Sequence, residues 1–154
     1  MMTFDRAALD ALAKRQRTAF LNGLSGFKSA NVLGSIDAAG RTNLALMSSV
    51  IHVGASPPLL GVLFRPHTVP RHSLENLIEQ DAYTLNHVSE AMYERAHRTS
   101  SRQPREVSEF ELVGLTPAFS DAHAAPYVAE SPVQIGLRPV ERHTLASNGC
   151  VLVV

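Results

Sequence analysis

Positive and hydroxyl side chains gather in one short segment, RPHTVPRHSLENL, at residues 65–77. Arg65, Thr68, Arg71 and Ser73 precede or open a predicted helix, whose unpaired backbone N–H groups and dipole favour an anion. Guanidinium groups bind phosphate through charge-assisted hydrogen bonds. The segment therefore predicts a phosphate site. The alternative is a solvated surface or a helix cap, which is the more common role of arginines beside a helix start.

A second segment, TNLALMSSVIHV at residues 42–53, places small and hydroxyl side chains inside a predicted strand. Ala45, Ser48 and Ser49 leave the backbone open to close approach by a flat ligand. A ligand that is flat at one end and anionic at the other, such as flavin mononucleotide (FMN), fits the two segments together. Alternatively, the two serines satisfy backbone groups at a strand end or a bulge.

The other reactive side chains form no recognisable motif. The histidines show no HxH, HxxxH or cysteine-paired spacing, so no metal site is predicted. Cys150 has no nearby basic neighbour and is not expected to act as a nucleophile. Because no GxGxxG fingerprint is present, a nicotinamide nucleotide would bind only transiently.

Composition limits the classes of partner and compartment. The 154 residues favour one domain, and 14 acidic and 14 basic side chains cancel, so no nucleic-acid partner is expected. The longest apolar stretch is interrupted by two prolines and is far shorter than the roughly 20 residues that span a bilayer. No membrane segment is therefore expected. A single cysteine and a charged amino terminus favour a reducing, cytoplasmic setting.

Hydrophobic periodicity and turn residues predict a mainly β chain with several helices. Turn chemistry at residues 37–40 and at Asn148-Gly149 indicates two hairpins. Residues 117–132 show no regular pattern and are expected to be irregular. We expect strands over residues 30–37, 41–53, 59–64, 82–88, 133–145 and 150–154. We expect helices over residues 5–23, 70–80, 89–98 and 107–115.

Three local expectations follow from these patterns. Ser73 is a suitable helix cap after Pro70, and the unbroken apolar strand at 59–64 should be buried on both faces. The apolar ending at residues 151–154 has two explanations. Either the chain is incomplete relative to the natural gene product, or these residues are buried as a terminal strand.

The order of four segments resembles the flavin reductase-like, FMN-binding split-barrel family. This family includes flavoredoxins and the small reductase components of two-component monooxygenases. The segments are NLALMSSV, GASPPLLGVLFRP, VPRHSLENL and YTLNHV, and the resemblance runs from about residue 24 to residue 145. It implies a mainly β fold with peripheral helices, an antiparallel split β-barrel, over a single domain of residues 1–154. It also implies a homodimer with FMN near the subunit interface.

The resemblance also assigns residues to the parts of the flavin. Arg71, His72 and Ser73 would hold the phosphate, with Arg65 and Thr68 as additions. Many reductases carry a hydroxyl residue at the position of Leu46, so one side-chain hydrogen bond to the flavin would be missing here. The residues that would face the isoalloxazine and ribityl groups, largely through the backbone, are Asn43, Ala45, Leu46, Met47, Ser48 and Ser49.

The function implied is electron transfer from NAD(P)H, as a transient co-substrate, through FMN to an acceptor such as a monooxygenase. The flavin would carry the chemistry, so no catalytic side chain is predicted. One alternative is a flavin-binding electron carrier without NAD(P)H turnover of its own. Another is a barrel that binds no flavin.

Overall fold

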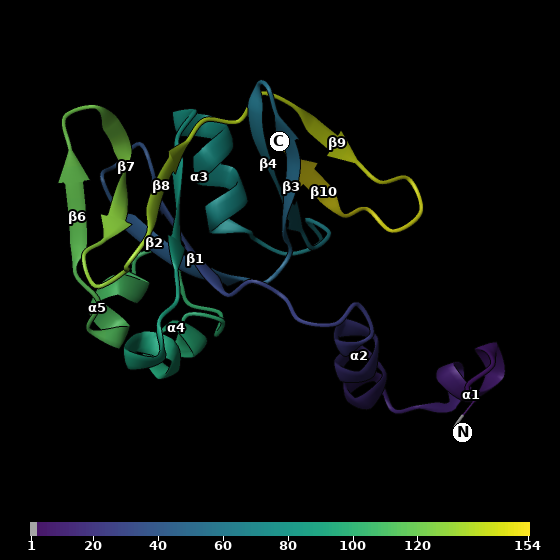
Figure 1. Cartoon of the computed structure of the whole chain (residues 1–154). Helices are drawn as coiled ribbons and strands as arrows, with labels where there is room; N and C mark the ends of the chain where they lie inside the picture. Colours follow the sequence, from purple (N-terminus) through teal and green to yellow (C-terminus); the bar gives the residue numbers. More distant parts are fainter. Residues whose placement is uncertain (1–2) are drawn as a thin grey trace.

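The structure is a computed structural model that describes residues 3–154, which form ten strands in three antiparallel sheets (Figure 1). The first sheet has the order β2-β1-β5-β8, the second β3-β4-β10-β9, and β6 and β7 form a separate pair. The strands are β1 (Asn31–Ile36), β2 (Thr42–Met47), β3 (Val50–Ala55), β4 (Pro58–Phe64), β5 (Tyr83–His87), β6 (Pro117–Ser120), β7 (His123–Val128), β8 (Gln134–Leu137), β9 (Arg142–Thr144) and β10 (Val151–Val153).

The hairpin between β1 and β2 follows the predicted turn. Asp37 Oδ1 accepts hydrogen bonds from the backbone N–H groups of Ala39 and Arg41, both at 2.9 Å, and Gly40 adopts a φ of +80°. This is the local chemistry by which aspartate and glycine reverse a chain. It fixes the register that pairs Ile36 with Thr42.

The expected single strand over residues 41–53 is wrong, because the chain changes sheets at Ser48 and Ser49. β2 pairs with β1, whereas β3 pairs with β4. The two serines lie at the corner between the sheets, in agreement with the alternative of a strand end. The sheets meet at this corner without closing into one continuous ladder, and the fold is therefore an antiparallel split barrel, as predicted.

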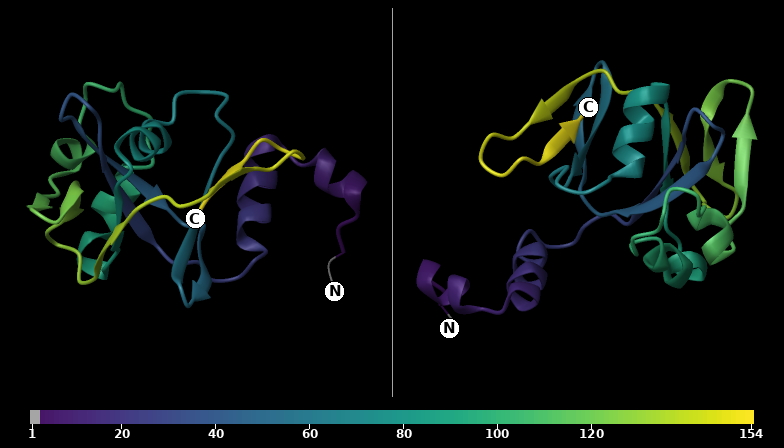
Figure 2. Two further views of the ribbon diagram at one scale, coloured as in Figure 1. Left: turned by 90° about the horizontal axis from the view of Figure 1, so that it is seen from above. Right: turned by 180° about the vertical axis from the view of Figure 1, so that it is seen from behind.

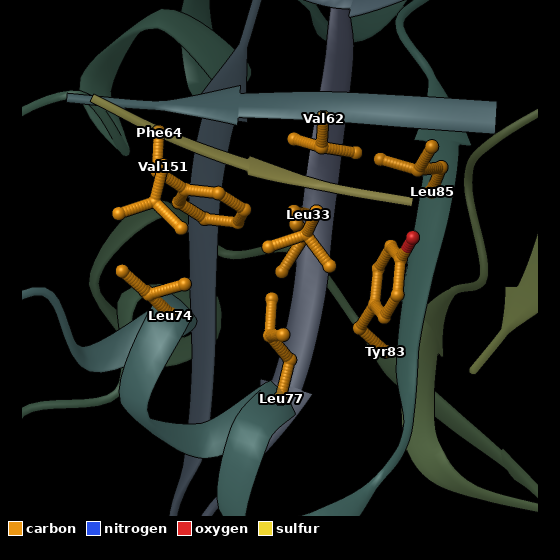
Figure 3. Close-up of a cluster of buried hydrophobic side chains, with 9 residues drawn as sticks. Leu33, Val62, Phe64, Leu74, Leu77, Tyr83, Leu85 and Val151 are labelled. Carbon is orange, nitrogen blue, oxygen red and sulfur yellow. The ribbon is translucent and has the colours of Figure 1, made fainter. Parts of the chain in front are cut away.

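Helix α3 (His72–Gln80) packs where the two large sheets meet. Leu74 and Leu77, on its inner face, contact strands of both sheets (Figure 3). The predicted cap is wrong: Arg71 is the cap residue and Ser73 lies inside the first turn, 7% exposed. The core cluster comprises Leu33, Val62, Phe64, Leu74, Leu77, Tyr83, Leu85, Val151 and Val153.

A second core lies on the other side of β1 and β2. The short helices η1 (Glu90–Met92), α4 (Tyr93–Arg98) and α5 (Glu109–Val113) cover it, which confirms the helices predicted near these positions. Gly114, with a φ of +69°, ends α5. The buried residues of this core are Val32, Leu44, Met92, Ala96, Phe110, Val113, Leu115 and Val128.

The expectation of an irregular segment over residues 117–132 is wrong, since most of it forms the β6–β7 hairpin. β7 packs against β1 and β5. Thr84 Oγ1 donates to the carbonyl of Pro126 at 2.7 Å, and Val128 N donates to Asn86 Oδ1 at 3.0 Å. Long-range contacts of this kind, and not a local pattern of side chains, define the hairpin.

The second sheet is buried on its inner side only. Leu63 is 37% exposed, so the expectation that strand 59–64 is buried on both faces is wrong. Val151 and Val153 are buried, and β10 pairs with both β4 and β9, which confirms the predicted terminal strand. Gly149, with a φ of +73°, lies in the predicted turn before β10.

The amino-terminal segment extends away from the sheets as an arm (Figure 2). The single helix expected over residues 5–23 is two helices, α1 (Arg6–Ala11) and α2 (Lys14–Gly23), because the backbone is extended at Leu12. Neither helix has a buried residue, and Phe27, which follows the arm, is fully exposed. Within residues 3–154, no helix is long and apolar enough to cross a membrane.

Candidate functional site

A cleft of about 620 Å³ opens where the two sheets, the start of α3 and the segment after α4 meet. Ten of the eleven predicted site residues line it, although they come from three separate parts of the sequence. They are Asn43, Ala45, Leu46, Met47, Ser48, Ser49, Arg65, Arg71, His72 and Ser73. Thr68 is not among the lining residues.

Hydrogen bonds tie β2 to the start of α3. Asn43 Nδ2 donates to Ser73 Oγ at 2.8 Å, and both side chains are buried. Asn76 Nδ2, one turn further along α3, donates to Ser35 Oγ on β1 at 3.2 Å. A serine hydroxyl that accepts a bond still has its proton to donate. Ser73 can therefore hold the cleft together and also donate to a ligand.

Three arginines share the cleft: Arg65, Arg71 and Arg102. Burial lowers the pKa of Arg71, and the positive charges of Arg65 and Arg102 lower it further. Within residues 3–154, no carboxylate oxygen lies within 4.0 Å of any of the three guanidinium groups. Arg65 and Arg102 therefore each repel Arg71, and an anion in the cleft would relieve this repulsion.

The backbone at the start of α3 is oriented by a nearby carboxylate. The N–H of Arg71 donates to Glu75 Oε1 at 2.9 Å, and His67 Nε2 lies 2.7 Å from the same oxygen. Glu75 thus caps the backbone at this helix start with its side chain, while the side chain of Arg71 makes no capping bond. Because Glu75 supplies this cap, the side chains of Arg71 and Ser73 are not used for capping. Ser73 bonds instead to Asn43.

Glu109 is a buried carboxyl in the cleft wall that the sequence did not single out. It is 6% exposed, and its Oε2 accepts from the backbone N–H of Leu44 on β2 at 3.1 Å. Burial raises the pKa of Glu109, and the hydrogen bonds to its carboxylate oppose this rise only in part. The side chain therefore connects α5 to the strand that forms the cleft floor.

The segment after α4 also lines the cleft, although no site residue was predicted in it. Its composition, rich in hydroxyl groups and arginine, is similar to that of the predicted phosphate segment, and this similarity was the available signal. Asn22 of α2 and Cys150 at the β9–β10 hairpin line the cleft too, without any motif that indicates it. The loop residues in the cleft wall are Thr99, Ser100, Ser101, Arg102 and Gln103.

The histidines are dispersed in the structure. His72 lines the cleft, whereas His123 Nε2 lies 3.0 Å from the carbonyl of Tyr83 on β5. Across residues 3–154, no three histidine, cysteine, aspartate or glutamate side chains are grouped so as to hold a metal ion.

A family model described as the flavin reductase like domain matches residues 24–154. The structure is similar to that of a provisionally named flavin reductase with a split barrel domain from Shewanella frigidimarina. The TM-score is 0.94 with 47% sequence identity, over 99% of this chain and 76% of that chain. Nitrilotriacetate monooxygenase component B from Bacillus cereus shares the fold, with a TM-score of 0.85 and 23% identity, over 99% of this chain and 77% of that chain.

One curated relative, an uncharacterized protein of Aquifex aeolicus, is 33% identical over 101 residues. The aligned region is 64% of this chain and 52% of that protein. The chain therefore spans about half the length of this relative.

Proposed function

The chain belongs to the flavin reductase-like domain family, and on this premise we propose that it binds FMN in the cleft and passes electrons from NAD(P)H through the flavin to an acceptor. The observation that carries this proposal is the convergence of β2 and the arginine cluster on one cleft. The cleft has a cationic end and a strand with small side chains, which suits a ligand with a phosphate at one end and flat rings at the other.

The phosphate end of the ligand would lie at the start of α3. Arg71 and Ser73 would donate hydrogen bonds to the phosphate oxygens, with His72 and Arg65 beside them. The repulsion between the cleft arginines favours a doubly charged anion there. Thr68 lies outside the cleft lining, so the proposal does not use it.

The ring end would lie along β2 and the corner that follows it. Backbone N–H and C=O groups between Asn43 and Ser49 would orient the rings, with small Ala45 permitting close approach. The aliphatic side chain of Leu46 cannot donate the hydrogen bond that a hydroxyl residue at this position would donate to the flavin. A bound flavin would supply hydride acceptance and electron transfer, while the chain binds and orients it.

We also propose that residues 1–154 are one domain of a cytoplasmic homodimer, with the flavin near the subunit interface. Ile51, Val53 and Leu63 are 53%, 45% and 37% exposed and lie on the outer side of the second sheet. Leu21, on the arm, is also exposed. Contiguous exposed apolar side chains of this size are typical of an interface. The acceptor could be a monooxygenase, as the name of the Bacillus cereus protein suggests for that protein.

The deciding experiment is an absorption spectrum of the purified protein with added FMN, followed by anaerobic addition of NADH or NADPH. We expect a bound flavin spectrum that either nucleotide bleaches. A bound flavin that both nucleotides leave oxidised would favour the alternative, an electron carrier without NAD(P)H turnover. A protein that takes up no FMN would contradict the proposal.

A further inference from the structure

Arg105 fastens the loop after α4 to the body of the protein. Its Nη1 donates to Asn76 Oδ1 at 3.0 Å and lies 3.7 Å from Asp37 Oδ2, and its Nη2 pairs with Glu75. The partners come from the β1–β2 turn and from α3, so one guanidinium joins three parts of the fold. We call these four residues the Arg105 clasp.

One carboxylate of the clasp also binds the backbone of a cleft residue. Glu75 pairs with Arg105 through Oε2, while its Oε1 accepts from the N–H of Arg71. Burial raises the pKa of Glu75, but hydrogen bonds from His67 and Arg71 and the charge of Arg105 outweigh it and lower the pKa overall. The carboxylate is therefore ionised at neutral pH and can hold both the helix start and the loop.

The clasp also restricts where Arg102 can lie. Arg102 precedes Arg105 by three positions, and three residues span at most about 10 Å even when fully extended. Pro104, between them, fixes its own φ and limits the residue before it. On the other side, Thr99 Oγ1 donates to the carbonyl of Ala96 at 2.8 Å. The backbone at Arg102 is therefore restrained at the cleft edge from both sides.

We propose that Arg102 binds a phosphate group of the cleft ligand and that Arg105 is the positioning residue that holds it there. This inference rests on the proposed function. Arg102 lies close enough to Arg71 for their charges to interact, and no carboxylate within residues 3–154 neutralises it. A guanidinium that is kept beside Arg71 by a dedicated clasp and has no carboxylate partner suits anion binding.

Fluorescence titrations with FMN and with riboflavin, which lacks the phosphate, test the role of Arg102. In Arg102→Ala, we expect the Kd for FMN to rise roughly tenfold or more, and the Kd for riboflavin to stay unchanged. Arg138→Ala removes one exposed positive charge outside the cleft and is the matched control, with no change expected. Equal weakening of FMN and riboflavin would overturn the assignment.

The phosphate could instead belong to the nicotinamide nucleotide. In that case, Arg102→Ala raises the KM for NADPH and not for NADH, and the Kd for FMN does not change. If none of these constants changes, the inference is wrong. Wild-type protein that binds no FMN contradicts the proposed function itself, whereas wild type that binds FMN as tightly as Arg102→Ala contradicts only a role in binding the flavin phosphate.

A double-mutant cycle tests the positioning role of Arg105. We expect Arg105→Met to lower the affinity for the same phosphate-bearing ligand. The double variant Arg102→Ala/Arg105→Met should bind this ligand as tightly as Arg102→Ala alone. A merely structural loss would add to the effect of Arg102→Ala, and that outcome would overturn the role of Arg105. If Arg105→Met does not fold, Arg105→Lys replaces it, because lysine keeps the charge but not the planar fork.

Discussion

The side chain of Ser73 has a different role from the one that its sequence position indicates. A serine after Pro70 is a typical helix cap, yet Arg71 is the cap residue, two positions earlier, and Glu75 accepts its backbone N–H. The Ser73 hydroxyl therefore bonds to Asn43 across the cleft floor. The bond between Ser73 and Asn43 joins residues that are 30 positions apart. Rules for helix caps use only neighbouring residues, so they could not predict it.

The first prediction concerns the phosphate end of the cleft. We expect Arg71→Ala combined with Ser73→Ala to weaken FMN binding by about 3–6 kcal/mol, because each charge-assisted hydrogen bond contributes roughly 1.5–3 kcal/mol. Fluorescence titration measures the change. Riboflavin binding serves as the internal control. Unchanged FMN affinity would count against a phosphate at this helix start.

The second prediction concerns the pH dependence of stability at Glu109. Its raised pKa means that the folded state holds its proton more tightly than the unfolded state does, so the buried carboxyl destabilises the fold as pH rises above about 4.3. Glu109→Gln still offers an oxygen to Leu44 N but does not ionise. We therefore expect its stability relative to wild type to increase with pH.

Urea unfolding of Glu109→Gln and wild type at several pH values measures this difference. Glu111→Gln changes an exposed position of the same helix and controls for the loss of one negative charge. A difference between Glu109→Gln and wild type that is constant with pH would show that the carboxyl does not titrate as inferred.

At the scale of elements, the corner at Ser48 and Ser49 creates the site. It ends β2 in the first sheet and begins β3 in the second, and the cleft opens beside it. The segments at 43–49 and 71–73 were predictable because each carries its own local signal. The loop at 99–103 carries a compositional signal, but its place in the cleft wall, like that of Glu109, was not predictable, because it depends on how α4 and α5 pack on β2.

The third prediction tests the packing of β7 on β1. A Cβ on Gly34 would overlap the Pro126 carbonyl and approach Thr84 Oγ1 at 2.6 Å. We expect Gly34→Ala to destabilise the protein by about 1–3 kcal/mol, as overpacking typically does. Gly23→Ala, in open space at the end of α2, is the control. Thermal or urea unfolding gives the comparison, and equal stability of both variants would contradict this packing.

At the scale of the whole molecule, the outer face of the second sheet remains apolar. Ile51, Val53 and Leu152 surround Gly61 on this side, next to Leu63. The sequence could not indicate that this outer face is exposed, because an apolar run such as 59–64 does not show which face of its strand is buried. Whether the run faces a core or a second copy depends on the arrangement of the sheets.

The fourth prediction concerns this face. We expect Ile51→Glu with Val53→Glu to raise the dissociation constant of the proposed homodimer by more than about a hundredfold, since a charge buried without a partner costs several kcal/mol. Sedimentation velocity measures the oligomeric state. Ile78→Glu, an exposed apolar position on α3, is the control. A dimer that persists in the double variant would place the interface elsewhere.

The position of β10 in the second sheet has a consequence for biosynthesis. β10 lies between β4 and β9, and its Val153 pairs with Val62 of β4. The two strands are far apart in the sequence, so β4 can pair with β10 only late in synthesis. Such a high contact order slows folding. While the nascent chain is still on the ribosome, the hairpin of β3 and β4 has an unpaired edge open to misassociation. Chaperone binding during translation would therefore be expected at this edge before β10 emerges.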